Sequence, residues 1–367
     1  MKITSVCAAI AASFLAAACS AQPSDLSHVR LPDGFAIEVY AEVPAARAMV
    51  EGADGTVFVS TRRDDVVYAV LDNNAGEGGS REVLVLDDGL DMPNGIAYKD
   101  GDLYVAELSR VLKYSSVDDQ LRDMPEPEVL DIELNDERHH GWREIAFGPD
   151  GLLYISLGAP CNVCDRDGFS KIVRMQPDGS EREDYALGVR NSVGFTWDPA
   201  TDHLWFTDNG RDMLGDDLPP DELNYAPVKD GHYGFPFCHG GFFLDPQFGD
   251  GKNCDDYVAP AEKLGAHVAS LGLDFYDGTE FPEAYQGRIF IAEHGSWNRT
   301  EKSGYRITTV TVENGQSVAY DVFADGFNEG NTVFGRPVDI LVRADGSMLV
   351  SDDQAGLLYR VTYEGSR

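Results

Sequence analysis

The stretch Asp150-Gly151-Leu152-Leu153-Tyr154-Ile155 joins an Asp-Gly turn to a bulky strand of high β-propensity. Turns of this kind connect neighbouring antiparallel strands. The same turn-and-strand pattern recurs five more times, at residues 54–59, 101–105, 202–206, 287–291 and 345–350. Most copies are spaced by roughly 45 to 60 residues, as in propeller blades. Six copies therefore predict six blades.

Apolar strands also flank each copy, for example 193–197 before the fourth copy and 66–70 after the first. Helical periodicity is nearly absent. This pattern predicts an all-β fold, a six-bladed β-propeller of four-stranded antiparallel blades, built by residues 20–367 as one domain. A β-sandwich would not explain six equivalent repeats.

Two further features concern how the ring closes and where it is interrupted. An early strand at residues 36–40 is predicted to pair with the last blade, which removes exposed sheet edges. The one long interval, between the fourth and fifth copies, predicts a disulfide-stapled insertion around residues 212–265. It should lie on one face of the propeller.

The first 19 residues have the pattern of an export signal. Lys2 is followed by an apolar, alanine-rich stretch at residues 6–18 that is too short to anchor a helix across a bilayer. Residues 16–19, Ala-Ala-Ala-Cys, resemble a lipobox, so we expect a periplasmic protein held at the outer membrane by a lipid on Cys19. Ordinary cleavage after Ala18, Ser20 or Ala21 would instead give a soluble periplasmic protein.

The composition is strongly acidic, with 63 acidic against 29 basic residues and a net charge of −34. This charge opposes binding to nucleic acid and to anionic membrane surfaces. It carries no information about a small substrate.

Four cysteines remain once Cys7 is removed with the signal and Cys19 is assigned to the terminus of the mature chain. An even number in an oxidising compartment predicts disulfides, most simply Cys161 with Cys164 and Cys238 with Cys254. A zinc site of four thiolates does not match this spacing. Covalent haem attachment is excluded because Asp165, where a histidine is needed, follows Cys164.

Positive or potentially positive side chains share one position in the repeat. Residues just before the innermost strand of each blade meet at one mouth of the channel, and counting back from the turns gives Arg47, Asn94, His140, Arg190 with Asn191, His267 and Arg336. So many cationic groups in an acidic protein indicate a bound anion. Each one alone could be an ordinary inter-blade hydrogen-bonding group.

Two candidate functions arise from this region. His140 is a candidate general base, because an unperturbed histidine has a pKa suited to proton transfer near neutral pH, and His139 is its nearest competitor for that role. After the fourth repeat, residues 207–212, 216–217 and 221–224 are rich in oxygen ligands and suit calcium, although their spacing is not that of an EF-hand. A solvated acidic loop is the alternative.

These motifs resemble the L-sorbosone dehydrogenase branch of the soluble pyrroloquinoline quinone (PQQ) aldose and pyranose dehydrogenases. The resemblance covers essentially the whole mature chain. It is carried by His140-Gly141-Trp142-Arg143-Glu144-Ile145-Ala146-Phe147, Gly188-Val189-Arg190-Asn191, Asp208-Asn209-Gly210-Arg211-Asp212, Asp221-Glu222-Leu223-Asn224 and Ala292-Glu293-His294-Gly295-Ser296-Trp297-Asn298-Arg299. It implies a propeller with PQQ on calcium at the channel mouth.

The resemblance also implies residue roles around the quinone. His140 would remove the proton from the anomeric hydroxyl of a sugar, while Arg190 and Asn191 contact the quinone oxygens and the developing negative charge. Arg336 would pair with the carboxylates of PQQ. His294 and Arg299 belong to the sorbosone-type motif and are predicted to bind the cofactor.

For the metal, the resemblance implies backbone carbonyls of Gly210 and Arg211 as ligands of the cofactor calcium. Asp221 and Glu222 match acids that hold calcium nearby. No haem motif is present, so electrons would pass to an external acceptor, a cytochrome or a membrane quinone.

Three positions depart from the related soluble glucose dehydrogenases. Ala159 replaces the acid that orients the histidine, and Val193 and Val338 replace a glutamine and an arginine. Glu144 or Asp165 is then the candidate for orienting His140.

Two other functions fit the same propeller. One is a calcium-dependent lactone hydrolase of the gluconolactonase type, and the other is a non-catalytic binding propeller. Reconstitution with PQQ and calcium separates them from the dehydrogenase.

Overall fold

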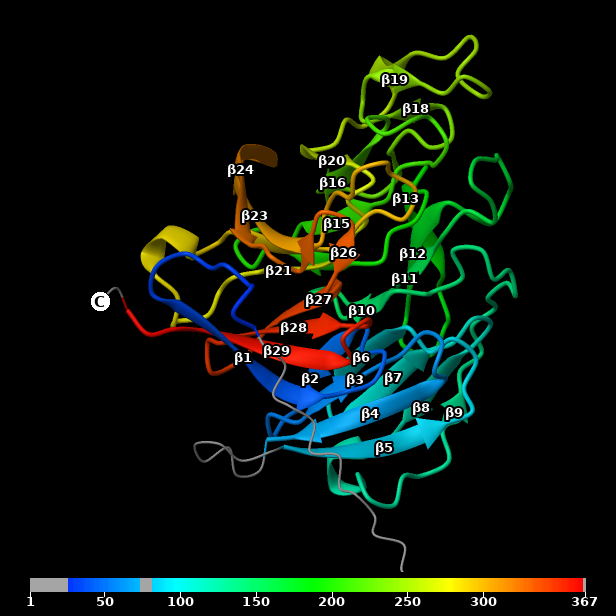
Figure 1. Cartoon of the computed structure of the whole chain (residues 1–367). Helices are drawn as coiled ribbons and strands as arrows, with labels where there is room; N and C mark the ends of the chain where they lie inside the picture. Colours follow the sequence, from blue (N-terminus) through cyan, green and yellow to red (C-terminus); the bar gives the residue numbers. More distant parts are fainter. Residues whose placement is uncertain (1–25, 73–80, 366–367) are drawn as a thin grey trace, which may run out of the picture.

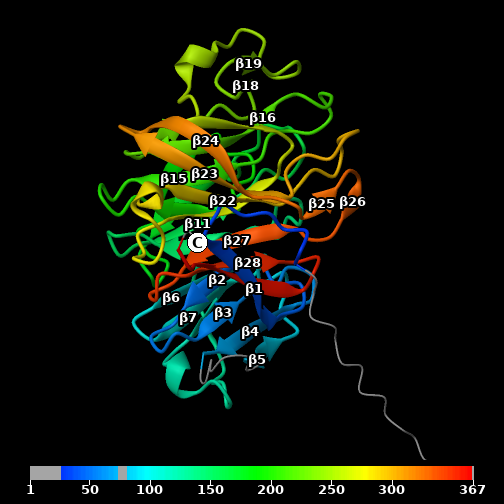
Figure 2. The same ribbon diagram turned by 60° about the vertical axis from the view of Figure 1, so that its left-hand side comes forward.

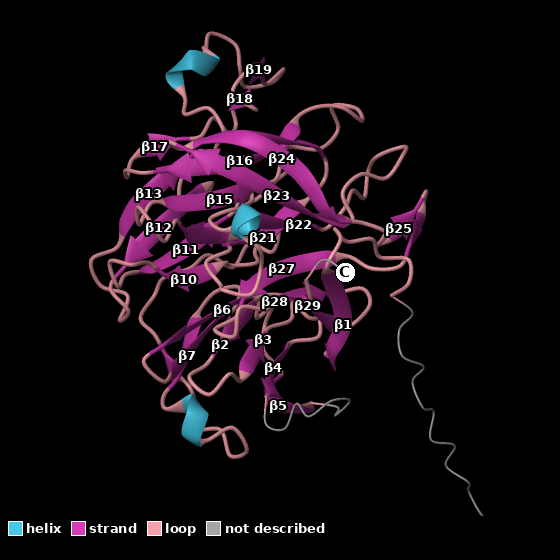
Figure 3. Cartoon of the chain, turned by 90° about the vertical axis from the view of Figure 1, so that its left-hand side faces the viewer, coloured by secondary structure: helices cyan, strands magenta, loops and turns pink. Residues whose placement is uncertain are grey.

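The computed structural model describes residues 26–72 and 81–365. The predicted export signal, its cleavage sites and Cys19 lie outside these residues. In the described part, regular structure consists of β-strands and three short 3-10 helices, η1 (Val117–Asp119), η2 (Cys254–Asp256) and η3 (Glu283–Tyr285). None of these helices is long and apolar enough to cross a membrane. The all-β prediction is confirmed (Figure 3).

Six sheets form the six blades of a β-propeller, as predicted. From the innermost strand outward, the first three blades consist of β2 (Met49–Glu51), β3 (Val57–Val59), β4 (Val66–Leu71) and β5 (Glu82–Asp88); β6 (Gly95–Lys99), β7 (Asp102–Ala106), β8 (Val111–Tyr114) and β9 (Glu128–Val129); and β10 (Ile145–Phe147), β11 (Leu153–Leu157), β12 (Lys171–Met175) and β13 (Glu183–Leu187).

The last three blades follow the same order. They consist of β14 (Phe195–Trp197), β15 (Leu204–Asp208), β16 (Pro220–Ala226) and β20 (Glu262–Ala266); β21 (Ser270–Phe275), β22 (Ile289–Glu293), β23 (Arg306–Glu313) and β24 (Gln316–Ala324); and β27 (Pro337–Val342), β28 (Met348–Asp352), β29 (Leu357–Tyr363) and β1 (Phe35–Glu42). A hairpin of β25 (Asn328–Glu329) and β26 (Thr332–Val333) precedes the sixth blade.

The ring closes by pairing the start of the described chain with its end. Strand β1 runs antiparallel to β29, with Phe35 opposite Tyr363 and Glu42 opposite Leu357. The blue strand β1 and the red strand β29 lie side by side (Figure 1, Figure 2). The predicted closure by residues 36–40 is confirmed.

The repeated turn-and-strand motif forms the second strand of every blade, β3, β7, β11, β15, β22 and β28. These strands are buried on both faces, since the apolar side chains of each blade pack against the next blade. Six apolar clusters occupy the six blade interfaces. Burial of this apolar surface stabilises the ring and fixes the loops at its mouth.

The predicted insertion interrupts the fourth blade between β16 and β20. It contains β17 (Gly231–His232), which adds a parallel fifth strand to the third blade beside β13, and the small hairpin of β18 (Cys238–His239) and β19 (Phe243–Leu244). The excursion itself spans residues 227–261, because β16 and most of β20, within the predicted 212–265, are blade strands. Its hairpin projects from the top of the molecule in Figure 1.

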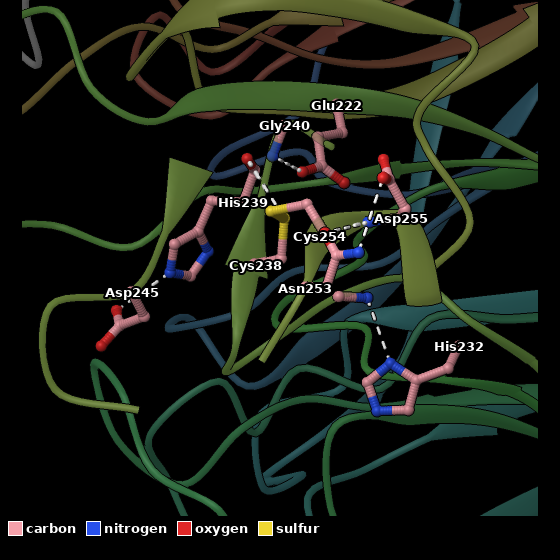
Figure 4. The surroundings of a disulfide bond; sticks show 10 residues. Glu222, His232, Cys238, His239, Gly240, Asp245, Asn253, Cys254 and Asp255 are labelled. Carbon is pink, nitrogen blue, oxygen red and sulfur yellow. Dashed lines mark hydrogen bonds and ion pairs between the residues drawn. A yellow bond between two sulfur atoms is a disulfide. The ribbon is translucent and has the colours of Figure 1, made fainter. Parts of the chain in front are cut away.

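Both predicted disulfides are present. Cys161 pairs with Cys164, with 6.2 Å between the Cα atoms, and Cys238 pairs with Cys254, with 5.5 Å between them. The second bond joins the β18–β19 hairpin to η2 within the insertion (Figure 4). Beside it, the backbone N–H of Gly240 donates to Glu222 of β16 at 2.7 Å, so the insertion contacts the fourth blade directly.

Candidate active site

A cavity of about 490 Å³ opens at one mouth of the channel. Two sets of loops surround it, those that precede the innermost strands and those that follow the second strands. Six arginines but only two carboxylates line it, in a protein of net charge −34. The lining arginines are Arg47, Arg62, Arg63, Arg138, Arg190 and Arg336, and the acids are Asp212 and Asp221. An anionic ligand is therefore favoured.

Most of the side chains predicted from the repeat position line this cavity. Arg47, His140, Arg190 with Asn191, His267 and Arg336 all contribute to the cavity wall. Asn94 does not line the cavity, but its side-chain oxygen accepts a hydrogen bond from Nε of Arg47 at 3.2 Å. The shared position thus brings together side chains that are far apart in sequence.

His140 is buried at this mouth with its ring held by backbone. Its Nδ1 lies 2.9 Å from the carbonyl oxygen of Ala159, and a carbonyl can only accept, so Nδ1 carries the hydrogen. Nε2 is thereby the unprotonated nitrogen of the neutral ring. Neither Glu144 nor Asp165 forms a hydrogen bond with His140 among the residues described. The orienting group is a carbonyl rather than an acid.

Local backbone geometry supports this arrangement. His140 has a φ of 51°, an uncommon conformation for a residue other than glycine. A Cβ atom on Gly158 would lie 2.6 Å from the Cβ of His140 and 2.7 Å from its carbonyl oxygen. Only glycine therefore allows the loop after β11 to approach His140 so closely.

The surroundings of His140 keep its ring neutral. Burial, followed by the charges of Arg190 and His139, holds the pKa of His140 well below its usual value of 6.5. The indole of Trp142 lies edge-on to the ring, with 6.0 Å between centroids. His140 is thus available as a proton acceptor at neutral pH.

Arg190 is buried and fixed by the loop of the first disulfide. Its Nε donates to the backbone oxygen of Asn162 at 2.9 Å, and Nη2 donates to the side-chain oxygen of Asn162 at 2.9 Å. Nη1 donates to the carbonyl of Asn209 at 3.1 Å, and Asp212 lies 3.4 Å from Nη2. Since Asn162 lies between Cys161 and Cys164, that disulfide loop positions the guanidinium.

The neighbouring Asn191 is held on both sides. Its backbone N–H, like that of Arg190, donates to the carboxylate of Asp208 at the end of β15, at 2.6 Å and 2.8 Å. Its side-chain oxygen accepts from the indole N–H of Trp142 at 3.0 Å. Burial raises the pKa of Asp208 to about 7, although both backbone N–H groups oppose the shift.

The segment predicted to hold calcium lies beside Arg190. Gly210 lines the cavity, and its N–H donates to Asp221 at 2.8 Å. The guanidinium of Arg211 points away into the insertion, where it pairs with Asp245 at 2.6 Å. The carboxylate of Asp221 also accepts from the backbone N–H groups of Ala269 and Ser270, at 2.6 Å and 3.4 Å.

Glu222 forms part of a second group of oxygens just outside the cavity. It lies opposite Asp208 in the β15–β16 register, and its carboxylate accepts from the N–H of Gly240 and the side-chain amide of Asn224. Burial, and then the charge of Asp208, raises the pKa of Glu222 to about 8. The side-chain oxygen of Asn224 is buried without a hydrogen-bond partner among the described residues. In the described chain no three His, Cys, Asp or Glu side chains form a metal cluster.

Of the two residues predicted from the motif at residues 292–299, only His294 contributes to the cavity. His294 lines the wall, and its Nε2 lies 2.8 Å from Asp353. Arg336 lies next to it and donates to the carbonyls of His294 and Gly295, at 3.1 Å and 2.8 Å. Arg299 does not line the cavity and instead pairs with the exposed Asp217 at 3.2 Å.

Val193 and Val338, two of the positions that depart from the glucose dehydrogenase pattern, lie in one apolar cluster. Both pack with Leu271, and the cluster contacts Trp142.

Several site residues were missed from the sequence. Arg62, Arg63, Arg138 and Asn162 have no assigned role in the motifs above, yet three of them line the cavity and Asn162 holds Arg190. Most follow the second strand of a blade, as do Asn209, His294 and Asp353. Extending the repeat comparison from the loop before the innermost strand to this loop would have identified Arg62, Arg63 and Asn162.

Comparisons with known proteins agree with this architecture. An uncharacterized protein of Borreliella burgdorferi is 32% identical over 360 residues, covering 92% of this chain and 92% of its own length. A Trichoderma reesei enzyme of carbohydrate-active enzymes family AA12 superposes with a TM-score of 0.80 at 20% identity, over 91% of this chain and 97% of that one. The holo PQQ domain of pyranose dehydrogenase from Coprinopsis cinerea superposes with a TM-score of 0.76 at 18% identity and the same coverage.

At these identities the two solved structures show a shared fold. The family model described as TrAA12-like matches residues 29–364, which is nearly all of the described chain. The protein therefore belongs to the TrAA12-like family.

Proposed function

We propose that this protein is an exported PQQ- and calcium-dependent dehydrogenase that oxidises a sugar, with His140 as the general base. The observation that carries this proposal is one cavity in which six arginines surround a neutral histidine whose Nδ1 is fixed by Ala159. The PQQ domain of the Coprinopsis pyranose dehydrogenase, which has the same fold, supports it. Within this group, the motif at residues 292–299 favours the sorbosone-type branch and thus an aldose, pyranose or sorbosone-like aldehyde.

The cavity fits PQQ in size and charge. Sites for small cofactors have volumes of about 300 to 1,000 Å³, and this one has about 490 Å³. PQQ carries three carboxylates, which Arg47 and Arg336 would bind, while Arg190 would contact the quinone oxygens. When bound, PQQ supplies a quinone that accepts hydride, and calcium polarises its carbonyl.

The protein's own groups then perform the proton and charge chemistry. Nε2 of His140 accepts the proton of the sugar hydroxyl, since Nδ1 is already donating to Ala159. The guanidinium of Arg190 stabilises the negative charge that develops on oxygen, because Asn162 and Asn209 hold it in place before the reaction. Trp142 and the apolar cluster of Val193, Leu271 and Val338 form a water-poor wall.

For calcium we propose the backbone carbonyls of Gly210 and Arg211 as ligands beside the quinone. The side chain of Arg211 turns away from the cavity and pairs with Asp245. This orientation supports the proposed role, because a ligand from Arg211 would have to be its backbone carbonyl. Asp221 and Glu222 are proposed for a neighbouring cation. The buried, unpartnered oxygen of Asn224 beside Glu222 is an oxygen that a hard cation would satisfy.

Export, a lipid on Cys19 and transfer of electrons to an external cytochrome or quinone complete the proposal. They rest on residues 1–19 and on the absence of a haem-attachment motif from the sequence.

Reconstitution tests the proposed activity. Purified, chelator-treated protein should show no turnover with an aldose and an artificial acceptor, and should gain it only when PQQ and calcium are added together. Restoration by NAD or a flavin would contradict the proposal, as would calcium-dependent lactone hydrolysis without PQQ.

Asn162→Ala tests the positioning of Arg190. This change removes a charge-assisted acceptor and should weaken PQQ binding by about tenfold to a hundredfold. Asn162→Asp keeps an acceptor oxygen for Arg190 and should retain most of the affinity, as measured by quenching of tryptophan fluorescence. Equal losses in the two variants would show that the Asn162 oxygen does not hold Arg190.

A further inference from the structure

A second cavity adjoins the first on the side away from Arg190 and Arg336. It has a volume of about 400 Å³ and is lined by Arg62, Arg63, Asp65, Asp91, Met92, Arg138 and Trp142. Four of these residues, the three arginines and Trp142, also line the first cavity. The two cavities therefore lie side by side, and Trp142, which contacts the ring of His140, lines both.

The arginines divide into two groups of three. Arg47, Arg190 and Arg336 line the first cavity but not the second, and they are the arginines proposed above to contact PQQ. Arg62, Arg63 and Arg138 line both cavities. These three are consequently left for a second anion that enters beside the quinone.

The second cavity contains carboxylates that neutralise only part of this charge. Arg138 pairs with Asp91 at 2.8 Å, and both side chains are largely exposed. Asp65, the other acid of the lining, forms no ion pair with Arg62 or Arg63. In the described part of the chain, no carboxylate lies within 4.0 Å of the guanidinium nitrogens of Arg62 or Arg63.

The surroundings of Arg62 show the cost of this unbalanced charge. Its guanidinium stacks on Trp142, with 4.6 Å from Cζ to the ring centroid. Burial, and then the charges of Arg47 and Arg63, lowers the pKa of Arg62 to about 9. A bound anion would relieve this repulsion, whereas a neutral hydroxyl would not.

We propose that the substrate is an anionic sugar, whose carboxylate or phosphate binds Arg62 and Arg63 while its reacting hydroxyl faces His140. This inference rests on the proposed dehydrogenase function and specifies its substrate class. The interaction of Trp142 with both Arg62 and Asn191 places the anion site next to the reaction site. A monosaccharide with its charge at the end remote from the anomeric carbon meets this requirement.

The test compares D-glucuronate with D-glucose, which differ in charge at C6 but share the anomeric centre. In the reconstituted wild-type enzyme, kcat/KM should be higher for glucuronate, and this preference should shrink as salt is raised. Arg63→Gln should lower the ratio of the two kcat/KM values by about tenfold to a hundredfold. Glucose 6-phosphate, as a third substrate, distinguishes a phosphate from a carboxylate.

Arg122→Gln is the matched control. It removes the same charge from an exposed arginine that pairs with Glu82 and lines neither cavity, so the ratio should not change. Calorimetry of glucuronate with the quinone-free protein gives a second readout, in which binding should be lost in Arg63→Gln.

The possible outcomes separate the two proposals. Loss of glucuronate binding in Arg63→Gln, with no PQQ-dependent activity on any sugar, would support the anion site and contradict the dehydrogenase. An unchanged ratio in Arg63→Gln, or a wild-type enzyme that prefers glucose to both anionic sugars, would overturn the anionic-sugar proposal and leave the dehydrogenase intact. Weaker PQQ binding in Arg63→Gln with an unchanged ratio would assign Arg63 to the cofactor and overturn it as well.

Discussion

Replacing His140 by alanine is expected to lower kcat by about a hundredfold to ten-thousandfold, the usual contribution of a positioned general base. The affinity for PQQ should change little, because the neutral ring makes no ion pair with an anionic cofactor. Steady-state kinetics at saturating PQQ and a separate PQQ titration measure the two effects.

His139→Ala is the control for this prediction. The two rings are neighbours, with 4.2 Å between their centroids, and both line the cavity. His139 lacks the bond to Ala159 that fixes the His140 ring, so its removal should cost far less activity. If His139→Ala or His294→Ala abolishes turnover while His140→Ala retains it, His140 is not the base.

The pH profile gives a further check on the same residue. The pKa of His140 is lowered by burial and by Arg190, so the histidine stays unprotonated when the pH falls through 6.5. The acid limb of kcat/KM should therefore lie below pH 6.5, and His140→Ala should remove it. An acid limb at or above pH 6.5 would mean that another group titrates or that the bound quinone reverses the shift.

Replacing Arg190 by alanine should have an effect of a different kind. It removes a charge-assisted contact to the cofactor and a stabiliser of the developing negative charge, so both PQQ affinity and turnover should fall. The loss in kcat should be about a hundredfold to a thousandfold, as for other fixed donors to an oxyanion. A PQQ titration combined with kinetics separates this result from that of His140→Ala.

Arg190→Lys is the control that separates loss of PQQ binding from misfolding. It keeps the buried charge near Asp212 but loses the fork of donors that Asn162 and Asn209 hold. We expect the lysine variant to unfold at nearly the wild-type temperature and still bind PQQ poorly. If both variants bind PQQ as the wild type does, Arg190 does not contact the cofactor.

The blades could be predicted from the sequence because their signal is local. An Asp-Gly turn and the strand after it lie within six residues, as in 150–155, so each second strand is visible without knowledge of its partners. Repetition then gave the number of blades. The fifth strand of the third blade, β17, could not be predicted, since it comes from the insertion and pairs with β13 across about 45 residues.

Residues of the candidate site were predicted only where they lie a similar number of residues before the turn of each repeat. Arg190 and Arg336 were found for this reason, whereas Asn162 lies in the loop after the second strand β11, which the repeat comparison did not include. The group that orients His140 had no side-chain signal at all, because it is the backbone carbonyl of Ala159. A search for an acid therefore led to Glu144 and Asp165, neither of which contacts the ring.

Binding of PQQ by the converging arginines is tested most directly by a calorimetric titration of the quinone-free protein with PQQ in the presence of calcium. We predict saturable binding of one PQQ per chain, weakened by about tenfold or more in Arg336→Gln and unchanged in Arg122→Gln. Absence of saturable binding, or equal affinity in the wild type and Arg336→Gln, would contradict the account.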